Sequence, residues 1–498
     1  MFKKEILVLS LALSAGCFVS SAQASGEAFE LVSRNPVNNV VSAGRYAAVS
    51  ADGRYIAFEG SSADLVSPSL GSGTLQQIFL FDRRLNKTEA ISIDNSGKPA
   101  TKEPGYPVIS GDGCKVAFVN SLNIFVRDRC AQPPVTIRVG ESISTNNGYN
   151  SHRNPDISAD GRYVAFEDSE NIYLHDIAAN STILISADTS GAKAGGRQPA
   201  ISADGSRIAF WSDSSKLVSG DTNGLWDIFL WDRTTKKITR VSTSAAGTAR
   251  KTDPGIGIST IVPPAISGNG RYVAFASSSS HLTGSSNEKI QLIIKDIQTG
   301  EIKIASSSSS GVIGNDDFGY SERPSLSSDG QWVLFTTTSK NIVSGAVNSN
   351  YLALYNNFTG KTTGIRHDIS DRFGASYRPV MSSDGRYVVV NYGEKLDPRF
   401  EDTGFFLHDR VARCLFDGFE DAVPAYLSPS RQTTNIAWLP PHVVYRHYSG
   451  TKSYMAIVND NDNLYYIGAN GQPLSLGPVN NWLTSSGDKS APVHFNCP

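Results

Sequence analysis

Five arginines occupy similar places in the chain, in or just before short segments that usually open with proline. Guanidinium groups bind carboxylates through paired hydrogen bonds, so arginines gathered at one rim could hold an anionic ligand. Each arginine could instead pair with an Asp or a carbonyl of a neighbouring unit. The arginines are Arg45, Arg153, Arg197, Arg323 and Arg378, and they are accompanied by Tyr46, Tyr106, Tyr377 and Glu322.

A second candidate site is the segment GDTNGLWD, which offers oxygen ligands from Asp221, Asn223 and Asp227. These residues resemble a shortened Ca²⁺ loop that lacks the full ligand set. An Asx turn explains the same spacing. Ca²⁺ is therefore the one cofactor that the sequence raises, and no other is expected.

The sequence contains no recognisable catalytic motif. Neither G-x-S-x-G nor H-E-x-x-H nor C-x-x-C occurs. The formal net charge of −2 gives no global electrostatic reason to bind nucleic acid. We therefore expect that the protein is not an enzyme and that its partner is not a nucleic acid.

The elements that position these residues belong to a repeat. Seven segments fit one template, in which a short strand is followed by an Asp-Gly or Asn-Gly turn and an aromatic, β-branched strand. The turn carboxylates and the Asp that ends each third strand are expected to serve structure. The turn residues are Asp52, Asp112, Asp160, Asp204, Asn269, Asp329 and Asp384.

Two further strands follow the template in most repeats, for example DIFLWDR and KITRVS. Four antiparallel strands repeated seven times predict an all-β, seven-bladed β-propeller. The last repeat lacks a clear fourth strand after 404–410, whereas Phe29–Ser33 matches the fourth-strand pattern before any first strand. We expect this N-terminal strand to close the ring and remove an exposed sheet edge; the alternative is an open stack of units.

The recurring pattern PxISxDGRxVAF…IFLxDRxTxKxTRVS resembles the TolB-like, WD-related propeller repeats of bacterial envelope proteins, over about residues 29–410. The resemblance implies a propeller and an envelope location, but no single activity. Some similar propellers are metal-assisted uronate lyases with His ligands on the face that carries the arginines here. The resemblance therefore leaves a metal-dependent polysaccharide lyase or hydrolase as the alternative function, with His152, His281 and His367 as candidate ligands.

Residues 1–24 have the order of a secretory signal peptide, with basic Lys3 and Lys4, the apolar Ile6–Leu13 and an A-x-A cleavage site that ends at Ala24. Cleavage before Cys17 with lipidation is an alternative. No transmembrane segment is expected, because the apolar run is too short and no later one is longer. The protein is thus expected in the periplasm or outside the cell.

Cleavage after residue 24 leaves four cysteines, an even number that suggests disulfides in an exported chain. Folding the predicted hairpin about Leu122 sets Cys114 opposite Cys130, which favours that pair. Cys414 and Cys497 then remain to clasp the C-terminal tail.

Three regions follow from this order: a signal peptide at 1–24, the propeller at 25–411, and a small β-rich region with its linker at 412–498. In the last region, two strands flank the polar turn Asn459–Asn463. The sequence predicts a monomeric, exported binding or scaffold module for a protein or an anionic glycan. Its ligand would lie at the mouth of the central channel, against Arg45, Tyr106, Arg153, Arg197, Arg323 and Arg378.

Overall fold

The computed structural model describes thirteen segments of the propeller region and four strands of the C-terminal region. The described residues are 29–38, 40–42, 44–71, 76–121, 123–140, 154–222, 224–244, 262–283, 289–317, 323–343, 351–365, 378–392 and 404–410, and the strands within 444–478.

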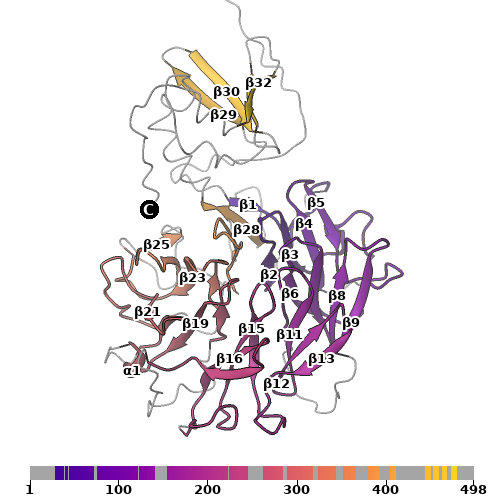
Figure 1. Ribbon diagram of the computed structural model, residues 1–498. Coiled ribbons are helices and arrows are strands. Elements are labelled where there is room, and N and C mark those ends of the chain that lie inside the picture. Colours follow the sequence, from indigo (N-terminus) through magenta and orange to yellow (C-terminus); the bar gives the residue numbers. More distant parts are fainter. Residues whose placement is uncertain are drawn as a thin grey trace, which may run out of the picture. The chain divides into compact units, whose positions relative to one another are not determined.

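The propeller region consists of seven four-stranded antiparallel sheets, or blades, which confirms the predicted fold class (Figure 1). Blade 1 has β2 (Ala47–Val49), β3 (Tyr55–Gly60), β4 (Gln77–Asp82) and β5 (Lys87–Ala90). Blade 2 has β6 (Pro104–Ile109), β7 (Lys115–Asn120), β8 (Asn123–Asp128) and β9 (Val135–Val139). Blade 3 has β10 (Asp156–Ile157), β11 (Tyr163–Asp168), β12 (Asn171–Asp176) and β13 (Ser181–Leu184).

The remaining blades repeat this order. Blade 4 has β14 (Arg197–Ile201), β15 (Arg207–Ser212), β16 (Asp227–Asp232) and β17 (Lys237–Arg240). Blade 5 has β18 (Ala265–Ile266), β19 (Tyr272–Ser277), β20 (Gln291–Asp296) and β21 (Ile302–Ile304). Blade 6 has β22 (Ser325–Leu326), β23 (Trp332–Thr337), β24 (Tyr351–Asn356) and β25 (Thr362–Ile365). Blade 7 has β26 (Val380–Met381), β27 (Tyr387–Tyr392), β28 (Gly404–Asp409) and β1 (Phe29–Leu31).

Helical structure in the described residues is limited to the short turns η1 (Ala63–Leu65) and α1 (Ser280–Thr283). None of the helices in the described part of the chain is long and apolar enough to cross a membrane.

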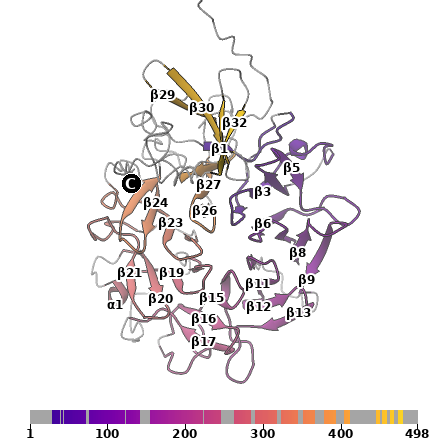
Figure 2. The same ribbon diagram turned by 45° about the horizontal axis from the view of Figure 1, so that its top comes forward.

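The ring is closed by the N-terminal strand, as predicted. The backbone N–H of Val32 donates to the carbonyl of Phe405 at 2.9 Å, and the N–H of Phe405 donates to Ser33 Oγ, also at 2.9 Å. Each first strand also contacts the first strand of the next blade, and the circle is completed where β26 contacts β2. Figure 2 shows the blades arranged around a common axis. The first strands therefore surround the axis of the propeller, and the Ser33 contact repeats the one that Ser92 makes with Ile78 N in blade 1.

Aromatic pairs fill the interior of the blades. The Phe of the repeated second strand lies opposite the Phe of the third strand, as in Phe58 with Phe79 and Phe210 with Phe229, whose ring centroids are 5.9 Å apart. All four side chains are fully buried. Such cross-strand aromatic pairs stabilise a sheet beyond the apolar area that they bury.

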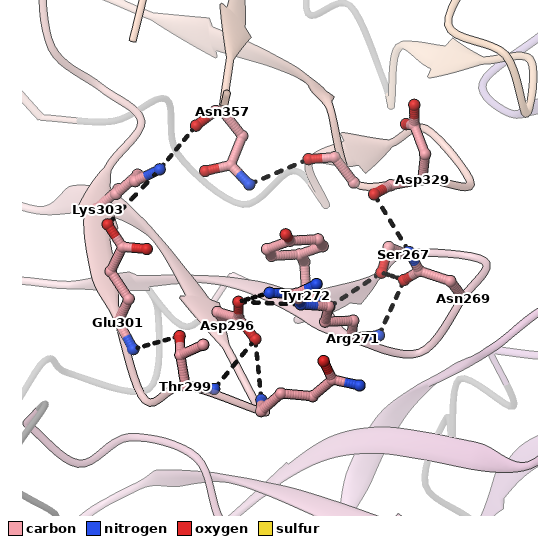
Figure 3. Close-up of polar contacts among 12 residues, drawn as sticks. Ser267, Asn269, Arg271, Tyr272, Asp296, Thr299, Glu301, Lys303, Asp329 and Asn357 are labelled. Atoms are coloured by element: carbon pink, nitrogen blue, oxygen red, sulfur yellow. Dashed lines mark hydrogen bonds and ion pairs between the residues drawn. The ribbon is translucent and has the colours of Figure 1, made fainter. Parts of the chain in front are cut away.

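The Asp-Gly and Asn-Gly turns lie at one end of the ring, which we call the turn end. In blade 5, Ser267 Oγ donates to Asn269 Oδ1 at 2.6 Å, and Arg271 donates to Asp296 Oδ2 at 2.6 Å (Figure 3). Asn269 Nδ2 also donates to the carbonyl of Asp329 in blade 6 at 3.2 Å. The expected structural role of the turn and third-strand residues is confirmed here, and the same Arg–Asp pair recurs as Arg54–Asp82 and Arg162–Asp176. In blade 4, Asp232 pairs instead with Arg207, which occupies the tyrosine position of the repeat.

Neighbouring blades are joined at the turn end through the tyrosine of the repeat. Tyr163 of blade 3 lies between Arg162 of its own blade and Arg233 of blade 4, with guanidinium carbons 5.0 and 4.2 Å from the ring centroid. Gly205 of the next turn has φ +65°, and a Cβ there would lie 2.5 Å from the Tyr163 ring. The Gly of the turn is thus required both by its left-handed backbone and by the close approach of the adjacent blade.

The predicted disulfide between Cys114 and Cys130 is present, with the Cα atoms 5.2 Å apart. The strand register of this hairpin differs by one residue from the predicted register. Because Lys115 pairs with Asp128, Arg129 is the residue that lies opposite Cys114, and the bridge reaches one residue further. The other predicted pair, Cys414–Cys497, lies outside the described residues.

The C-terminal region contains a sheet of its own, formed by β29 (Val444–Ser449), β30 (Lys452–Val458), β31 (Asn463–Ile467) and β32 (Pro473–Pro478). The pairing of β30 with β31 is the hairpin that the sequence predicts around 459–463. The predicted region boundaries, at residues 24 and 411, fall outside the described residues.

Candidate functional site

The end of the ring opposite the turns, where the first strands begin, carries a set of residues at one repeat position. This position directly precedes the repeat proline, or Ala47 in blade 1. We call the set the pre-proline ring. Its members are Tyr46, Tyr106, Asn154, Gln198, Pro263, Arg323 and Arg378, one from each blade in order.

Three residues of the pre-proline ring have a left-handed backbone: Tyr106, Gln198 and Arg378 have φ values of 55°, 52° and 49°. A non-glycine residue in this region costs about 1 kcal/mol or more. In blades 2 and 4 the pairing of the first strand also shifts register around the proline. Strain and bulges of this kind redirect side chains and are concentrated at functional sites.

Two buried carboxylates support the strained backbone. Glu59, at the end of β3, accepts hydrogen bonds from the N–H groups of Tyr106 at 3.1 Å and Arg45 at 3.0 Å. Glu167, the equivalent residue of β11, accepts from the N–H of Gln198 at 3.1 Å. Burial raises the pKa of Glu59, and it raises the pKa of Glu167 to about 7.

Arg378 extends from blade 7 towards blades 1, 2 and 3. Its guanidinium carbon lies 5.1 Å from the ring centroid of Tyr46 and 5.8 Å from that of Tyr106, and these two rings stack at 4.4 Å. Arg378 also donates to Asn154 Oδ1 at 3.5 Å. Burial, together with the neighbouring Tyr106, raises the pKa of Tyr46.

Arg323 extends from blade 6 towards blades 3 and 4. It donates to the carbonyl oxygens of Pro199 at 2.7 Å and Gln198 at 3.3 Å, and it lies 3.6 Å from the carboxylate of Asp156. Burial lowers the pKa of Arg323 to about 10, Asp156 opposes this shift, and the positive charge of Arg378 adds to it. Burial also raises the pKa of Asp156, against the effect of Arg323.

Two buried polar atoms of this site, Arg323 Nε and Gln198 Oε1, have no hydrogen-bond partner within the described residues. Buried polar atoms are usually hydrogen-bonded, so each such atom calls for an explanation. Both belong to the pre-proline ring, which already holds the strained backbone.

The structure thus brings together three of the predicted ligand-binding residues, namely Tyr106, Arg323 and Arg378. Arg197 instead forms an ion pair with Glu170 at the tip of the β11–β12 hairpin. Arg45 is exposed and contributes its backbone N–H to Glu59. The predicted residues Arg153, Glu322 and Tyr377 lie outside the described residues.

Glu59 and Glu167 are functional candidates that the sequence analysis does not single out. A signal for them exists: the residue that follows the second-strand Phe is Glu in blades 1 and 3 but Val, Trp, Ala or Thr in blades 2, 4, 5 and 6. Their contact with the next blade's pre-proline residue, however, depends on how blades pack.

The predicted calcium ligands Asp221 and Asp227 both face Arg240, at 2.8 and 3.5 Å. Asp227 also accepts a hydrogen bond from Ser242 Oγ. The third ligand, Asn223, lies outside the described residues, as do His152, His367 and the side chain of His281. Within the described segments, no three His, Cys, Asp or Glu side chains are grouped so that they could hold a metal ion.

No family model matches the sequence. No curated protein matches it either. Among solved structures, the chain is similar to TolB from Acinetobacter baumannii, with 18% identity over 62% of this chain and 65% of that one and a TM-score of 0.35. It thus spans slightly less than two thirds of the length of that protein.

Two further structures are similar to this chain. A TolB candidate from Agrobacterium tumefaciens matches at 16% identity over 66% of this chain and 96% of that one, with a TM-score of 0.35. Hydrazine synthase from Kuenenia stuttgartiensis matches at 12% identity over 74% and 96% of the two chains, with a TM-score of 0.40. TolB structures are therefore among those to which this chain is similar, while its assignment as a propeller rests on its own strand pairing.

Proposed function

We propose that the protein is a non-catalytic binding module of the bacterial envelope, acting as a monomer, that holds a protein or anionic glycan partner against the pre-proline ring. The propeller supplies a rigid frame, and the ends of its first strands present different side chains on one surface. Binding by such a frame needs no catalytic group.

The observation that carries this proposal is the difference between the two ends of the ring. At the turn end, fold requirements place nearly the same residues in every blade: Ser, then Asp or Asn, then Gly. At the pre-proline position the residue types are Tyr, Tyr, Asn, Gln, Pro, Arg and Arg. A repeat that only had to fold would have no need for this variety.

Two features support an exported location. The N-terminal residues have the order of a signal peptide, as argued from the sequence. In addition, the Cys114–Cys130 disulfide is of a kind that persists in oxidising compartments.

The test is capture of a partner from an envelope extract by the purified full-length protein. Arg378→Ala should lose the partner, because Arg378 links four blades of the pre-proline ring. Arg84→Ala is the matched control, since Arg84 is an exposed arginine at the turn end and the change in charge is the same. Undiminished capture by Arg378→Ala would show that the partner binds elsewhere.

A further inference from the structure

Two arginines from adjacent blades converge on the same short segment across the axis. Arg378 of blade 7 donates to Asn154 Oδ1, and Arg323 of blade 6 faces Asp156 Oδ2, two residues further along blade 3. They are close enough for the charge of Arg378 to affect Arg323. Two guanidinium groups thus lie beside residues 154–156.

Few carboxylates of the described residues lie close to these two arginines. In the described part of the chain, Asp156 is the one carboxylate within ion-pair distance of either guanidinium. Glu167 hydrogen-bonds to the side chain of Asn154, and burial raises the pKa of Glu167 to about 7. Two guanidinium groups therefore have one carboxylate within ion-pair distance among the described residues.

Arg323 donates to the Pro199 carbonyl at 2.7 Å, but the contacts of the two arginines with side chains of blade 3 are longer. The contacts of Arg378 with Asn154 and of Arg323 with Asp156 are 3.5 and 3.6 Å long. Well-formed charge-assisted hydrogen bonds are about 2.7–2.9 Å long, and the turn-end pair Arg54–Asp82 reaches 2.8 Å. Arg323 Nε is buried and has no partner among the described residues, whereas 16% of the Arg323 side chain is exposed, so a ligand can reach other atoms of this side chain.

We propose that Arg323 and Arg378 together hold one carboxylate group of a partner polypeptide, from an Asp or Glu side chain or from a C-terminus. The proposal rests on the proposed function and names the group that the pre-proline ring recognises. A carboxylate would add one negative group to a site where two guanidinium groups have one carboxylate within ion-pair distance among the described residues. The planar carboxylate also matches the guanidinium fork.

The aromatic residues at the site favour a polypeptide over a uronic acid. Sugars bind aromatic side chains through the open face of the ring. Tyr46 and Tyr106 stack on each other, and Arg378 packs over both. The tyrosines therefore orient Arg378 and leave the carboxylate as the recognised group.

The experiment is calorimetric titration of the full-length protein with short peptides. Ac-Ala-Glu-Ala-NH₂ tests a side-chain carboxylate, Ac-Ala-Gln-Ala-OH tests a C-terminal carboxylate, and the neutral Ac-Ala-Gln-Ala-NH₂ is their common reference. At least one carboxylate peptide should bind about ten-fold or more tightly than the neutral one. The peptide that does so identifies the source of the carboxylate.

Variants assign the binding to the arginines. Arg378→Gln should abolish the tighter binding of the carboxylate peptide. Arg378→Lys should reduce the difference in affinity, but the carboxylate peptide should still bind more tightly than the neutral one. Arg84→Gln at the turn end should leave this difference unchanged. The thermal unfolding midpoint of each variant shows that it is folded. Equal binding of all three peptides, a preference that survives Arg378→Gln, or stronger binding of glucuronate or inorganic phosphate would each overturn the proposal.

This outcome is separable from that of the proposed function. If partner capture depends on Arg378 but no carboxylate peptide binds more tightly than the neutral one, the proposed binding function is supported and the carboxylate assignment is refuted. If a carboxylate peptide binds through Arg378 but partner capture does not need Arg378, the carboxylate site is supported, and the proposal that the partner binds at the pre-proline ring is refuted.

Discussion

Replacing Glu167 with glutamine should change how stability depends on pH. Glu167 is 4% exposed, and burial raises its pKa from an ordinary 4.5 to about 7, against the opposing effects of the Gln198 N–H, the charge of Arg197 and the Asn154 side chain. The folded protein therefore binds this proton more tightly than the unfolded chain does. Between pH 4.5 and 7 the free energy of unfolding should fall as pH rises, because the folded state holds more protons.

The size of this effect follows from the rise in pKa. At about 1.4 kcal/mol per pKa unit, an increase from 4.5 to about 7 corresponds to roughly 3 kcal/mol, present in full below pH 4.5 and lost above pH 7. Glutamine cannot ionise, but its oxygen can still accept from the Gln198 N–H. Glu167→Gln should thus be close to the wild type in stability at pH 5 and more stable by up to about 3 kcal/mol at pH 8.

Denaturant unfolding at pH 5, 6 and 8 measures this difference. Subtracting the wild type removes the contributions of Glu59 and Asp156, whose pKa values are also raised by burial. Glu301→Gln is the control, since Glu301 is 57% exposed in its side chain and pairs with Lys303 at the surface, so its removal should cost less than about 1 kcal/mol. If the stability of Glu167→Gln relative to the wild type were the same at pH 5 and pH 8, the buried-carboxylate account of this site would be refuted.

Two further predictions concern the frame. Ser33→Ala removes the acceptor of the buried Phe405 N–H, so the free energy of unfolding should fall by about 1–2 kcal/mol in denaturant titration; no change would mean that the N-terminal strand does not close the ring in solution. Replacing Cys114 and Cys130 by serine opens a cross-link between residues 16 apart, which should cost about 3 kcal/mol and lower the thermal midpoint to that of the reduced wild type. Equal thermal midpoints for the oxidised wild type and the double variant would contradict the prediction that this disulfide stabilises the protein.

The fold could be predicted in detail because the sequence contains the same strand and turn pattern seven times. The turn dipeptide, the alternating second strand and the fourth-strand likeness of Phe29–Ser33 each depend on local sequence, and the structure has the strand of that segment at Phe29–Leu31 beside β28. The one-residue difference in the Cys114–Cys130 register arose because a two-residue turn, not a single central residue, joins the strands.

The site could be predicted only in part. Arg197 precedes its proline by two residues and Arg378 by one. Arg197 pairs with Glu170, whereas Arg378, with its left-handed backbone, reaches Asn154 of blade 3. Glu167 accepts from Gln198 of the next blade, and Asp156 faces Arg323 of a distant blade. The distances within these two pairs depend on how the blades pack. Residue types at a repeat position therefore indicated the region, whereas the pairing needed three-dimensional structure.

The most direct test of the central claim is photo-crosslinking in cells at the two ends of the ring. A photoreactive phenylalanine at Arg45, exposed at the proline end, should form a covalent adduct with the partner. The same residue at Phe358, which is 54% exposed and follows β24 at the turn end, should not. An adduct at Phe358 with none at Arg45 would place the partner on the opposite end and contradict the account.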